Sequence, residues 1–249
     1  MTTAIITMAG FGRRFLDAGY SIPKYRIEAH GRSLFTWSLL SLKSFIEQGT
    51  RFVFVVREAD NAGEFIAAEA AALSIVDREI VELDGPTDGQ ATTVMKAEPA
   101  VIATDRSMLI YNIDTFVDPR SLPATGPQGD GWIPCFPAQG DHWSFAAADS
   151  HGRVREVREK VRISNHATIG LYWFSSFEIY AEAYRNQGSE TQLEAGERYV
   201  APLYNHLIAA GRPVYVHEVP LDAVIPLGLP SDVERFREMM PPSIAVDRA

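Results

Sequence analysis

Short apolar segments alternate with segments of helical spacing along the first half of the chain. The expected strands are rich in Val, Ile and Phe and lie at 4–8, 51–56, 80–83 and 107–111. Between them, apolar residues recur at intervals of three and four, which predicts helices at 33–46, 61–73 and 91–97. Strands that alternate with helices form right-handed βαβ units. This half is therefore predicted to be an α/β fold with a mainly parallel, Rossmann-like sheet flanked by helices.

The pattern changes after about residue 118. Consecutive strand-like segments, joined in one case by a turn at 150–152, predict an antiparallel section: 132–136, 143–148, 153–161 and 167–174. Further elements are expected in the order helix, helix, strand, strand, helix: 176–186, 200–210, 214–219, 224–225 and 231–239. No repeat or Pro/Gly/Ser-rich linker is present. The chain is expected to form one domain over 1–240, with halves 1–118 and 119–240, and a mobile tail over 241–249.

The net charge of the chain makes some classes of binding partner less suitable than others. A formal net charge of −9 argues against nucleic acid or an anionic membrane surface. No apolar run is long enough to span a membrane, and Cys135 is the only cysteine, so a cytoplasmic protein without disulfides is expected. Against this acidic background, four cations fall within fourteen residues: Arg13, Arg14, Lys24 and Arg26. A phosphate-bearing small molecule is therefore compatible with the composition.

A glycine pair directly follows the first predicted strand. Without Cβ atoms, Gly10 and Gly12 let backbone N–H groups approach an anion, and the carboxyl end of a parallel strand is where ligands bind in such sheets. A polyphosphate here would meet the loop first and then two side chains: Ala9, Gly10, Gly12 and Arg13, followed by Arg14 and Lys24. A tight turn with exposed arginines is the alternative. Phe15 stands where a dinucleotide-binding loop needs a third glycine, and no P-loop pattern occurs.

Two other positions are candidates from their place alone. Asp114 follows a buried strand, where a carboxylate is suited to Mg²⁺ or to an Asx turn. Gly89 and Gln90 stand where a loop enters a helix. The glycine permits close approach, and the glutamine offers a donor and an acceptor to a nucleobase. Helix capping by Asp88 is the alternative.

Two motifs, in this order, resemble those of the sugar-phosphate nucleotidylyltransferases, the sugar-nucleotide pyrophosphorylases of the glucose-1-phosphate thymidylyltransferase type. Residues 10–14 and then Pro23-Lys24 are similar to the family's Gly-x-Gly-[Ser/Thr]-Arg and Pro-Lys. Glu159-Lys160 and the stretch 164–172 are similar to its Glu-Lys and Ser-Asn-x-Ala-x-x-Gly-x-Tyr. The resemblance spans about residues 3–235. It looks closest to the branch associated with capsular and surface polysaccharides.

The resemblance implies a GT-A-like fold of the nucleotide-diphospho-sugar transferases and a Mg²⁺-dependent reaction. A nucleoside triphosphate would react with a sugar phosphate or a similar phosphorylated metabolite, and pyrophosphate would leave. Homo-oligomers are also implied, because family members often assemble.

The implied roles divide between two substrates. Arg14 and Lys24 would act on the triphosphate, Asp114 would bind the metal, and the 89–90 segment would read the base. On the acceptor side, four residues are implied: Glu159 for hydroxyl groups, Lys160 for the phosphate, and Asn165 and Gly170 for the pocket wall. Without the family, Glu159-Lys160 would be interpreted as a solvated pair at a strand end.

The chain departs from the family at two positions. Arg13 occupies the Ser/Thr position of the loop, and Pro226 replaces a second metal-binding Asp. Either Asp114 and the phosphates suffice for the metal, or another acid such as Asp222 substitutes, or the activity is altered. Two other functions stay open. A nucleotide-sugar-dependent glycosyltransferase would usually carry Asp-x-Asp where this chain has 112–114 (Asn-Ile-Asp), and a non-catalytic nucleotide-binding protein would turn nothing over.

Overall fold

The computed structural model describes residues 2–101, 106–187 and 197–242. The helices are α1 (Arg13–Asp17), α2 (Leu34–Leu40), α3 (Lys43–Glu47), α4 (Gly63–Ala72), α5 (Gln90–Met95), α6 (Phe177–Asn186), α7 (Tyr204–Ala209) and α8 (Pro230–Glu238). The strands are β1 (Thr3–Thr7), β2 (Glu28–Ala29), β3 (Arg32–Ser33), β4 (Arg51–Arg57), β5 (Arg78–Leu83), β6 (Met108–Asn112), β7 (Thr115–Val117), β8 (Gly131–Phe136), β9 (Ser144–Ala148), β10 (Val154–Glu159), β11 (Ala167–Thr168), β12 (Leu171–Phe174), β13 (Val214–Glu218) and β14 (Val224–Pro226). The predicted tail lies outside the described residues from 243 onward.

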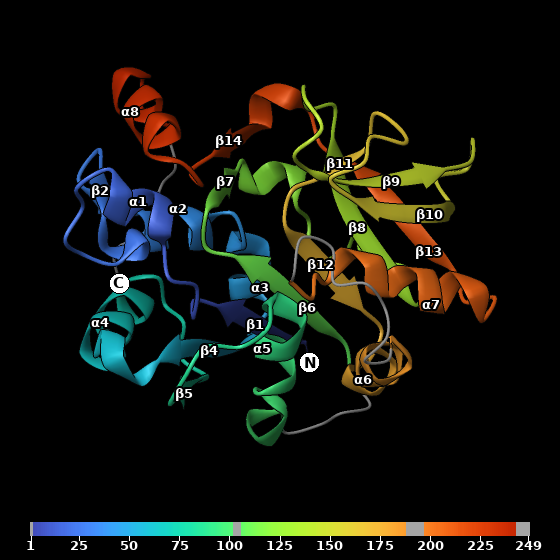
Figure 1. The fold of residues 1–249 in the computed structure, drawn as a ribbon, viewed down its shortest axis with the longest axis horizontal. Helices are drawn as coiled ribbons and strands as arrows, with labels where there is room; N and C mark the ends of the chain where they lie inside the picture. Colours follow the sequence, from blue (N-terminus) through green and yellow to red (C-terminus); the bar gives the residue numbers. More distant parts are fainter. Residues whose placement is uncertain (1, 102–105, 188–196, 243–249) are drawn as a thin grey trace.

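In the described part of the chain, a ten-stranded sheet crosses the molecule in the order β10-β9-β11-β8-β12-β6-β1-β4-β5, with β13 beside β8 (Figure 1). The strands β5, β4, β1 and β6 are parallel neighbours. An antiparallel section begins where β12 pairs with β6 and continues to β10, and β13 adds a parallel pairing with β8. The predicted fold class, an α/β protein with a helix-flanked sheet and an antiparallel section, is confirmed.

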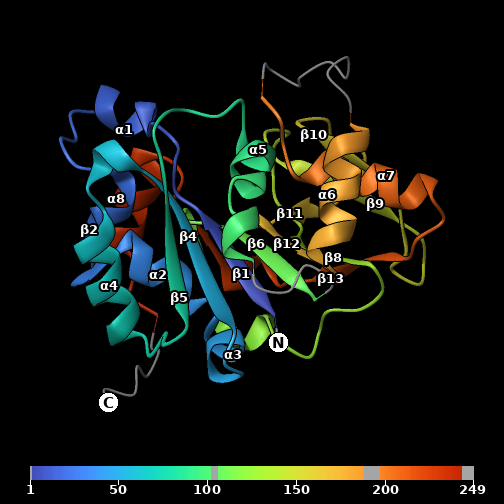
Figure 2. The same cartoon turned by 90° about the horizontal axis from the view of Figure 1, so that it is seen from below.

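Helices cover both faces of this sheet. On β1, Ala4 and Ile6 pack into a core with side chains of α2, α4 and α8, whereas Ile5 packs into a second core with α5, α6 and α7. Helices α5, α6 and α7 stand on one side of the sheet in Figure 2. Strands buried on both faces need continuous apolar sequence, which explains why β1, β4 and β6 could be predicted from the sequence. No helix among the described residues combines the length and apolarity needed to cross a membrane.

Two predicted elements are each divided in two. The helix expected at 33–46 breaks after α2, where the hydroxyl of Ser41 accepts a hydrogen bond from Val117 N at 2.8 Å. The strand expected at 167–174 breaks at Gly170, whose φ of +80° is incompatible with an extended strand. β11 and β12 therefore pair with different neighbours on one side, β9 and β6.

Several short elements were not predicted. They include α1, the β2–β3 hairpin and β7, which pairs with β14. In the predicted helix 200–210, Pro202 lies in a 3-10 turn (Ala201–Leu203) and α7 begins only at Tyr204. Elements of two to five residues carry too few positions to show a period.

Candidate functional site

The carboxyl ends of β1 and β6 bring polar side chains together. Thr7 and Asn112 are register partners at the last positions of the two strands. Gln90, the first residue of α5, donates from its amide nitrogen to Thr7 Oγ1 at 3.1 Å and to Asn112 Oδ1. Gln90 is thereby fixed at the sheet edge. Its reading of a base stays a prediction, and Thr7 and Asn112 are site residues that were not predicted.

Lys24 and Asp114 meet at the same edge although ninety residues separate them. Lys24 Nζ lies 3.0 Å from Asp114 Oδ2, and the two side chains are 20% and 31% exposed. Lys24 is placed by a 3-10 turn (Lys24–Arg26) that follows Pro23, and Asp114 follows β6 directly. A partly exposed pair of opposite charge can exchange its partner for a charged ligand at little cost.

The glycine loop joins β1 to α1. Gly12 has a φ of +62° and is the N-cap of α1, and a Cβ placed on it would lie 4.0 Å from Lys24 Cβ. The loop therefore lies against Lys24. Arg13 and Arg14 are both exposed. The loop has the geometry of the tight turn named as the alternative, and its binding of an anion stays a prediction.

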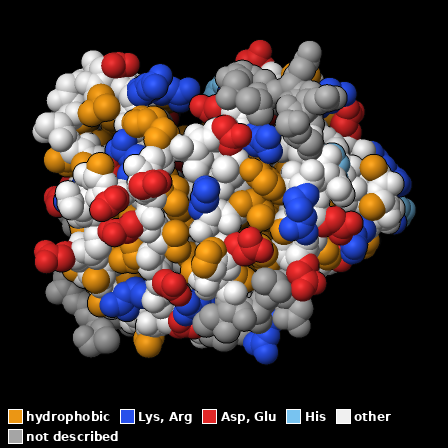
Figure 3. Space-filling model, turned by 60° about the horizontal axis from the view of Figure 1, so that its bottom comes forward, with side chains coloured by type: hydrophobic (Ala, Val, Ile, Leu, Met, Phe, Trp, Pro, Cys, Tyr) orange, Lys and Arg blue, Asp and Glu red, His pale blue; other side chains and the backbone are white. Residues whose placement is uncertain are grey.

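Arg13, which departs from the family pattern, lies against an aromatic ring of its own loop. Its guanidinium carbon is 5.5 Å from the centre of the Phe11 ring, and that of Arg57 is 4.8 Å from the same centre. Phe11 itself is 44% exposed. Figure 3 shows acidic and basic side chains interspersed over one face of the molecule.

The chain after β14 runs beside Asp114. Leu227 N donates to Asp114 O at 2.8 Å, and a Cβ on Gly228 would lie 3.7 Å from Asp114 Oδ2. Pro226 pairs with Thr115, so it stands next to Asp114, the residue predicted to bind the metal.

Asp222 does not substitute for the missing second carboxylate. It is exposed and lies beyond the opposite end of the β7–β14 pairing, where Ala223 O accepts from Asp118 N at 2.8 Å. At about 3.3 Å per strand residue, this places Asp222 more than about 10 Å from Asp114. Within the described residues, no group of three or more His, Cys, Asp or Glu side chains could hold a metal ion.

On the other half of the sheet, Glu159 is buried with only 6% of its surface exposed. It accepts a hydrogen bond from Ser144 Oγ. Burial and, next, the charge of Glu159 raise the pKa of Tyr172 well above its ordinary value, so the tyrosine is a neutral neighbour of the carboxylate. The interpretation of Glu159-Lys160 as a solvated pair is wrong for Glu159, because a buried carboxylate needs such partners.

Lys160 follows Glu159 in a left-handed conformation with a φ of +54°. Its Nζ donates to the hydroxyl of Tyr199 at 2.5 Å and lies 4.6 Å from the centre of that ring. Burial lowers the pKa of Lys160, but the hydrogen bond to Tyr199 and the charges of Glu159 and Glu197 outweigh it, so the pKa is raised. Lys160 therefore stays a cation at neutral pH.

Asn165 and Gly170 occupy different surroundings. Asn165 is exposed, and its Oδ1 accepts from Arg162 Nη1 at 3.3 Å. Gly170 is buried against Asn112, since its O accepts from Asn112 N at 3.1 Å and a Cβ would lie 2.6 Å from Asn112 Nδ2. Gly170 thus contacts Asn112, which accepts a hydrogen bond from Gln90. The contact of either residue with an acceptor stays a prediction.

The segment 197–200, here called the strap, crosses the loop before α5. Arg198 N donates to Asp88 O at 2.8 Å, and Arg198 O accepts from Ala91 N at 3.0 Å. Gly89 has a φ of +146°, and a Cβ on it would lie 2.4 Å from the Arg198 backbone. In this structure, the absence of a side chain at Gly89 lets the strap approach the backbone of the loop. Gly89, not Asp88, is the N-cap of α5, while the Asp88 carboxylate lies 3.0 Å from Arg198 Nε.

Replacement of Gly170 with alanine is expected to cost about 2–3 kcal/mol in the free energy of unfolding, because backbone strain and a clash with Asn112 add. Gly211 is a matched control, since its φ of +75° is nearly that of Gly170 and nothing lies within 4 Å of its added Cβ. Gly211→Ala should cost only about 1 kcal/mol. Denaturant unfolding of both variants measures the difference, and equal losses would contradict the close contact with Asn112.

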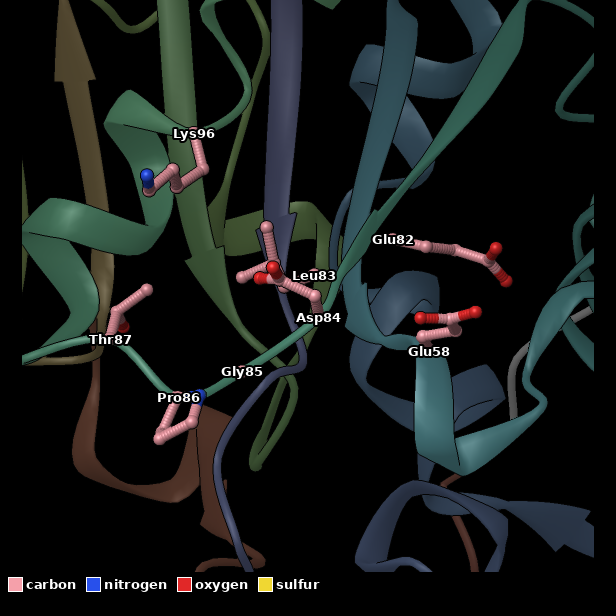
Figure 4. A pocket seen from close by; sticks show the side chains of 8 residues that line it. All are labelled: Glu58, Glu82, Leu83, Asp84, Gly85, Pro86, Thr87 and Lys96. Carbon is pink, nitrogen blue, oxygen red and sulfur yellow. The ribbon is translucent and has the colours of Figure 1, made fainter.

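A pocket of about 440 Å³ lies along the loop that joins β5 to α5 (Figure 4). Its charged side chains are three acids and one base: Glu58, Glu82, Asp84 and Lys96. This lining opposes phosphate binding and contains none of the predicted phosphate-binding residues. The pocket is therefore beside the candidate site and not its phosphate-binding part.

No protein-family model and no curated protein matches the chain. Among solved structures, a nucleoside-diphosphate-sugar pyrophosphorylase from Vibrio cholerae RC9 is 36% identical, with a TM-score of 0.88 over 95% of this chain and 100% of that chain. An inositol-1-phosphate CTP transferase from T. maritima is 18% identical, with a TM-score of 0.75 over 96% and 95%. A Bacillus anthracis protein assigned as a glucose-1-phosphate thymidylyltransferase is 14% identical, with the same TM-score over 96% and 94%. The last two share the fold.

Proposed function

The chain belongs to the nucleoside-diphosphate-sugar pyrophosphorylase family, and from this premise we propose that it is a nucleotidyltransferase that uses a nucleoside triphosphate and a sugar phosphate or similar phosphorylated metabolite. The observation that carries the proposal is the Lys24–Asp114 pair at 3.0 Å beside the glycine loop. A third charged group, Lys160, directly follows β10 in the antiparallel part of the same sheet and suits the phosphate of the acceptor. The implied role in surface-polysaccharide synthesis and the implied self-association are part of the same proposal.

The proposed reaction needs no nucleophile from the protein. An oxygen of the acceptor phosphate attacks the α-phosphorus of the triphosphate, a new P–O bond forms, and the P–O bond to pyrophosphate breaks. The protein contributes positioning and charge neutralisation. Arg14 and Lys24 would hold the triphosphate with the N–H groups of the glycine loop, and Lys160 would orient the attacking phosphate.

The residues present fit one Mg²⁺ ion. Asp114 offers a partly exposed carboxylate, and Gly228 leaves room beside its Oδ2. Mg²⁺ commonly binds through one or two carboxylates and keeps waters and substrate phosphates as its other ligands, so Pro226 need not abolish binding. When bound, the ion would neutralise phosphate charge.

A pyrophosphate-release assay tests the proposal directly. The assay would use the four ribonucleoside triphosphates and dTTP, Mg²⁺, and a panel of sugar phosphates and other phosphorylated metabolites. We expect release that depends on the acceptor and favours one triphosphate. Release of a nucleoside diphosphate from a nucleotide sugar would instead identify a glycosyltransferase. Triphosphate binding without turnover across the panel would favour a non-catalytic nucleotide-binding protein.

A further inference from the structure

Lys160 is held at both of its ends. Its backbone N donates to Trp143 O at 2.9 Å, and its φ of +54° directs the chain away from the extended path of β10. At the other end, the ammonium group donates to the Tyr199 hydroxyl at 2.5 Å and lies over the ring. A free lysine side chain samples many rotamers, and binding would otherwise have to overcome the loss of that entropy. Tyr199 therefore restrains a side chain that would be mobile at the surface.

The place of Tyr199 is set by the loop that precedes α5. The neighbouring Arg198 is bound through both of its backbone groups to Asp88 and Ala91, and its guanidinium lies 3.0 Å from the Asp88 carboxylate and over the Tyr184 ring at 5.4 Å. These contacts also require Gly89, because any Cβ there would meet the Arg198 backbone. The strap thus connects the loop before Gln90 to the ammonium group of Lys160.

We propose that Tyr199 is a positioning residue for Lys160, and that Arg198 anchors it so that the acceptor-side cation is placed relative to the nucleotide-side loop. The inference rests on the proposed function, in which Lys160 holds the attacking phosphate. An ammonium group has three donors. One donor is used on Tyr199, and two remain for phosphate oxygens in a direction that the tyrosine fixes. Tyr199 touches Lys160 and need not touch the reacting atoms.

A purely structural role for this contact is a poor alternative. Lys160 is exposed, and exposed polar pairs contribute little to stability. The charged groups that face the ammonium are Glu159 and Glu197. They favour the cation but cannot fix its direction, whereas the hydroxyl and the ring of Tyr199 define one position.

The composition of the chain allows a direct test, because it contains only four lysines: Lys24, Lys43, Lys96 and Lys160. Each amine can be followed by competitive acetylation over a pH series with mass spectrometry of the peptides. Tyr199→Phe removes the hydroxyl and keeps the ring. Because the hydrogen bond raises the pKa of Lys160, its loss should raise the acetylation rate of Lys160 at pH 8.5 roughly threefold or more. The other three lysines serve as internal controls.

Tyr215→Phe is the matched control, because it removes the hydroxyl of a partly buried tyrosine on β13 and should change the reactivity of no lysine. Arg198→Ala should shift Lys160 in the same direction as Tyr199→Phe, by a smaller factor. Unchanged Lys160 reactivity in Tyr199→Phe would overturn the positioning role, and unchanged reactivity in Arg198→Ala would overturn the anchor.

Inorganic phosphate separates this inference from the proposed function. In the wild-type chain, phosphate should protect Lys160 from acetylation, and Tyr199→Phe should need several-fold more phosphate for the same protection. A wild-type Lys160 that phosphate does not protect would overturn its acceptor role, whatever the effect of Tyr199→Phe. With an acceptor from the release assay, Tyr199→Phe should raise the KM for the acceptor and leave the KM for the triphosphate unchanged. An unchanged KM for the acceptor would overturn the inference.

Discussion

Asp114→Ala is expected to lower turnover in the pyrophosphate-release assay by at least about 10²–10³-fold. The carboxylate is proposed to hold the metal ion together with the substrate phosphates, and no group of three or more His, Cys, Asp or Glu side chains among the described residues could hold the ion instead. The variant should fold normally, since Asp114 is partly exposed and its backbone O, which accepts from Leu227 N, is retained. The measurement is kcat at saturating substrates, with unfolding curves to confirm the fold.

Asp222→Ala is the control for this prediction, because Asp222 is exposed and lies at the far end of the β7–β14 pairing. Its turnover should match that of the wild type. A second readout is calorimetric binding of Mg²⁺ in the presence of pyrophosphate, which should weaken strongly in Asp114→Ala. Near-normal turnover or Mg²⁺ binding in Asp114→Ala would remove the residue from its assigned role.

Lys24→Ala is expected to reduce turnover by a similar factor, at least about 10²–10³-fold, because one cation on the triphosphate is lost in the transition state. Lys43→Ala is the matched control. That lysine lies on the surface of α3, where it pairs with Glu47 four residues away. The assay is again pyrophosphate release. If Lys24→Ala kept most of its activity, the loop would bind the triphosphate without this lysine.

The contact between Lys24 and Asp114 adds a sharper expectation. Residues that touch usually have non-additive effects, and these two are 3.0 Å apart. The double variant should therefore lose less activity than the product of the two single losses. A fully multiplicative loss would indicate that the residues act independently, in spite of their contact.

The parallel part of the fold could be predicted from the sequence, whereas the short elements could not. A strand such as β4, buried over five consecutive residues, is apolar throughout and can be predicted locally. By contrast, β7 has three residues and exists through its pairing with β14, more than a hundred residues later. The break after α2 has a similar origin, because the hydroxyl of Ser41 serves the backbone of β7.

The candidate site shows the same division. Lys24 was predicted as part of the Pro-Lys motif, and Asp114 was predicted from its place after a buried strand and from the family resemblance. The structure brings the two side chains into contact. The register of β1 against β6 places Thr7 beside Asn112 at the site. The spacing of these residues along the chain could not predict that contact. Arg198 and Tyr199 follow a charged, unremarkable stretch and gain their place only through packing against Gly89 and Lys160. The suggestion that Asp222 replaces the second metal-binding Asp was wrong. The sequence does not show that Asp222 lies at the end of β14 that is far from Asp114.

The junction between the two parts of the sheet limits how the molecule can move. β12 is paired to β6 from Leu171–Tyr111 to Phe174–Met108, so the sheet continues from one part into the other. Enzymes that close by hinge rotation need an interface that can open, and a shared ladder of backbone hydrogen bonds resists that. In the proposed reaction, we therefore expect substrates to enter and pyrophosphate to leave through rearrangement of side chains and short loops, while the strands of the sheet keep their positions. Structures with and without substrates should superpose closely over the strands of this sheet.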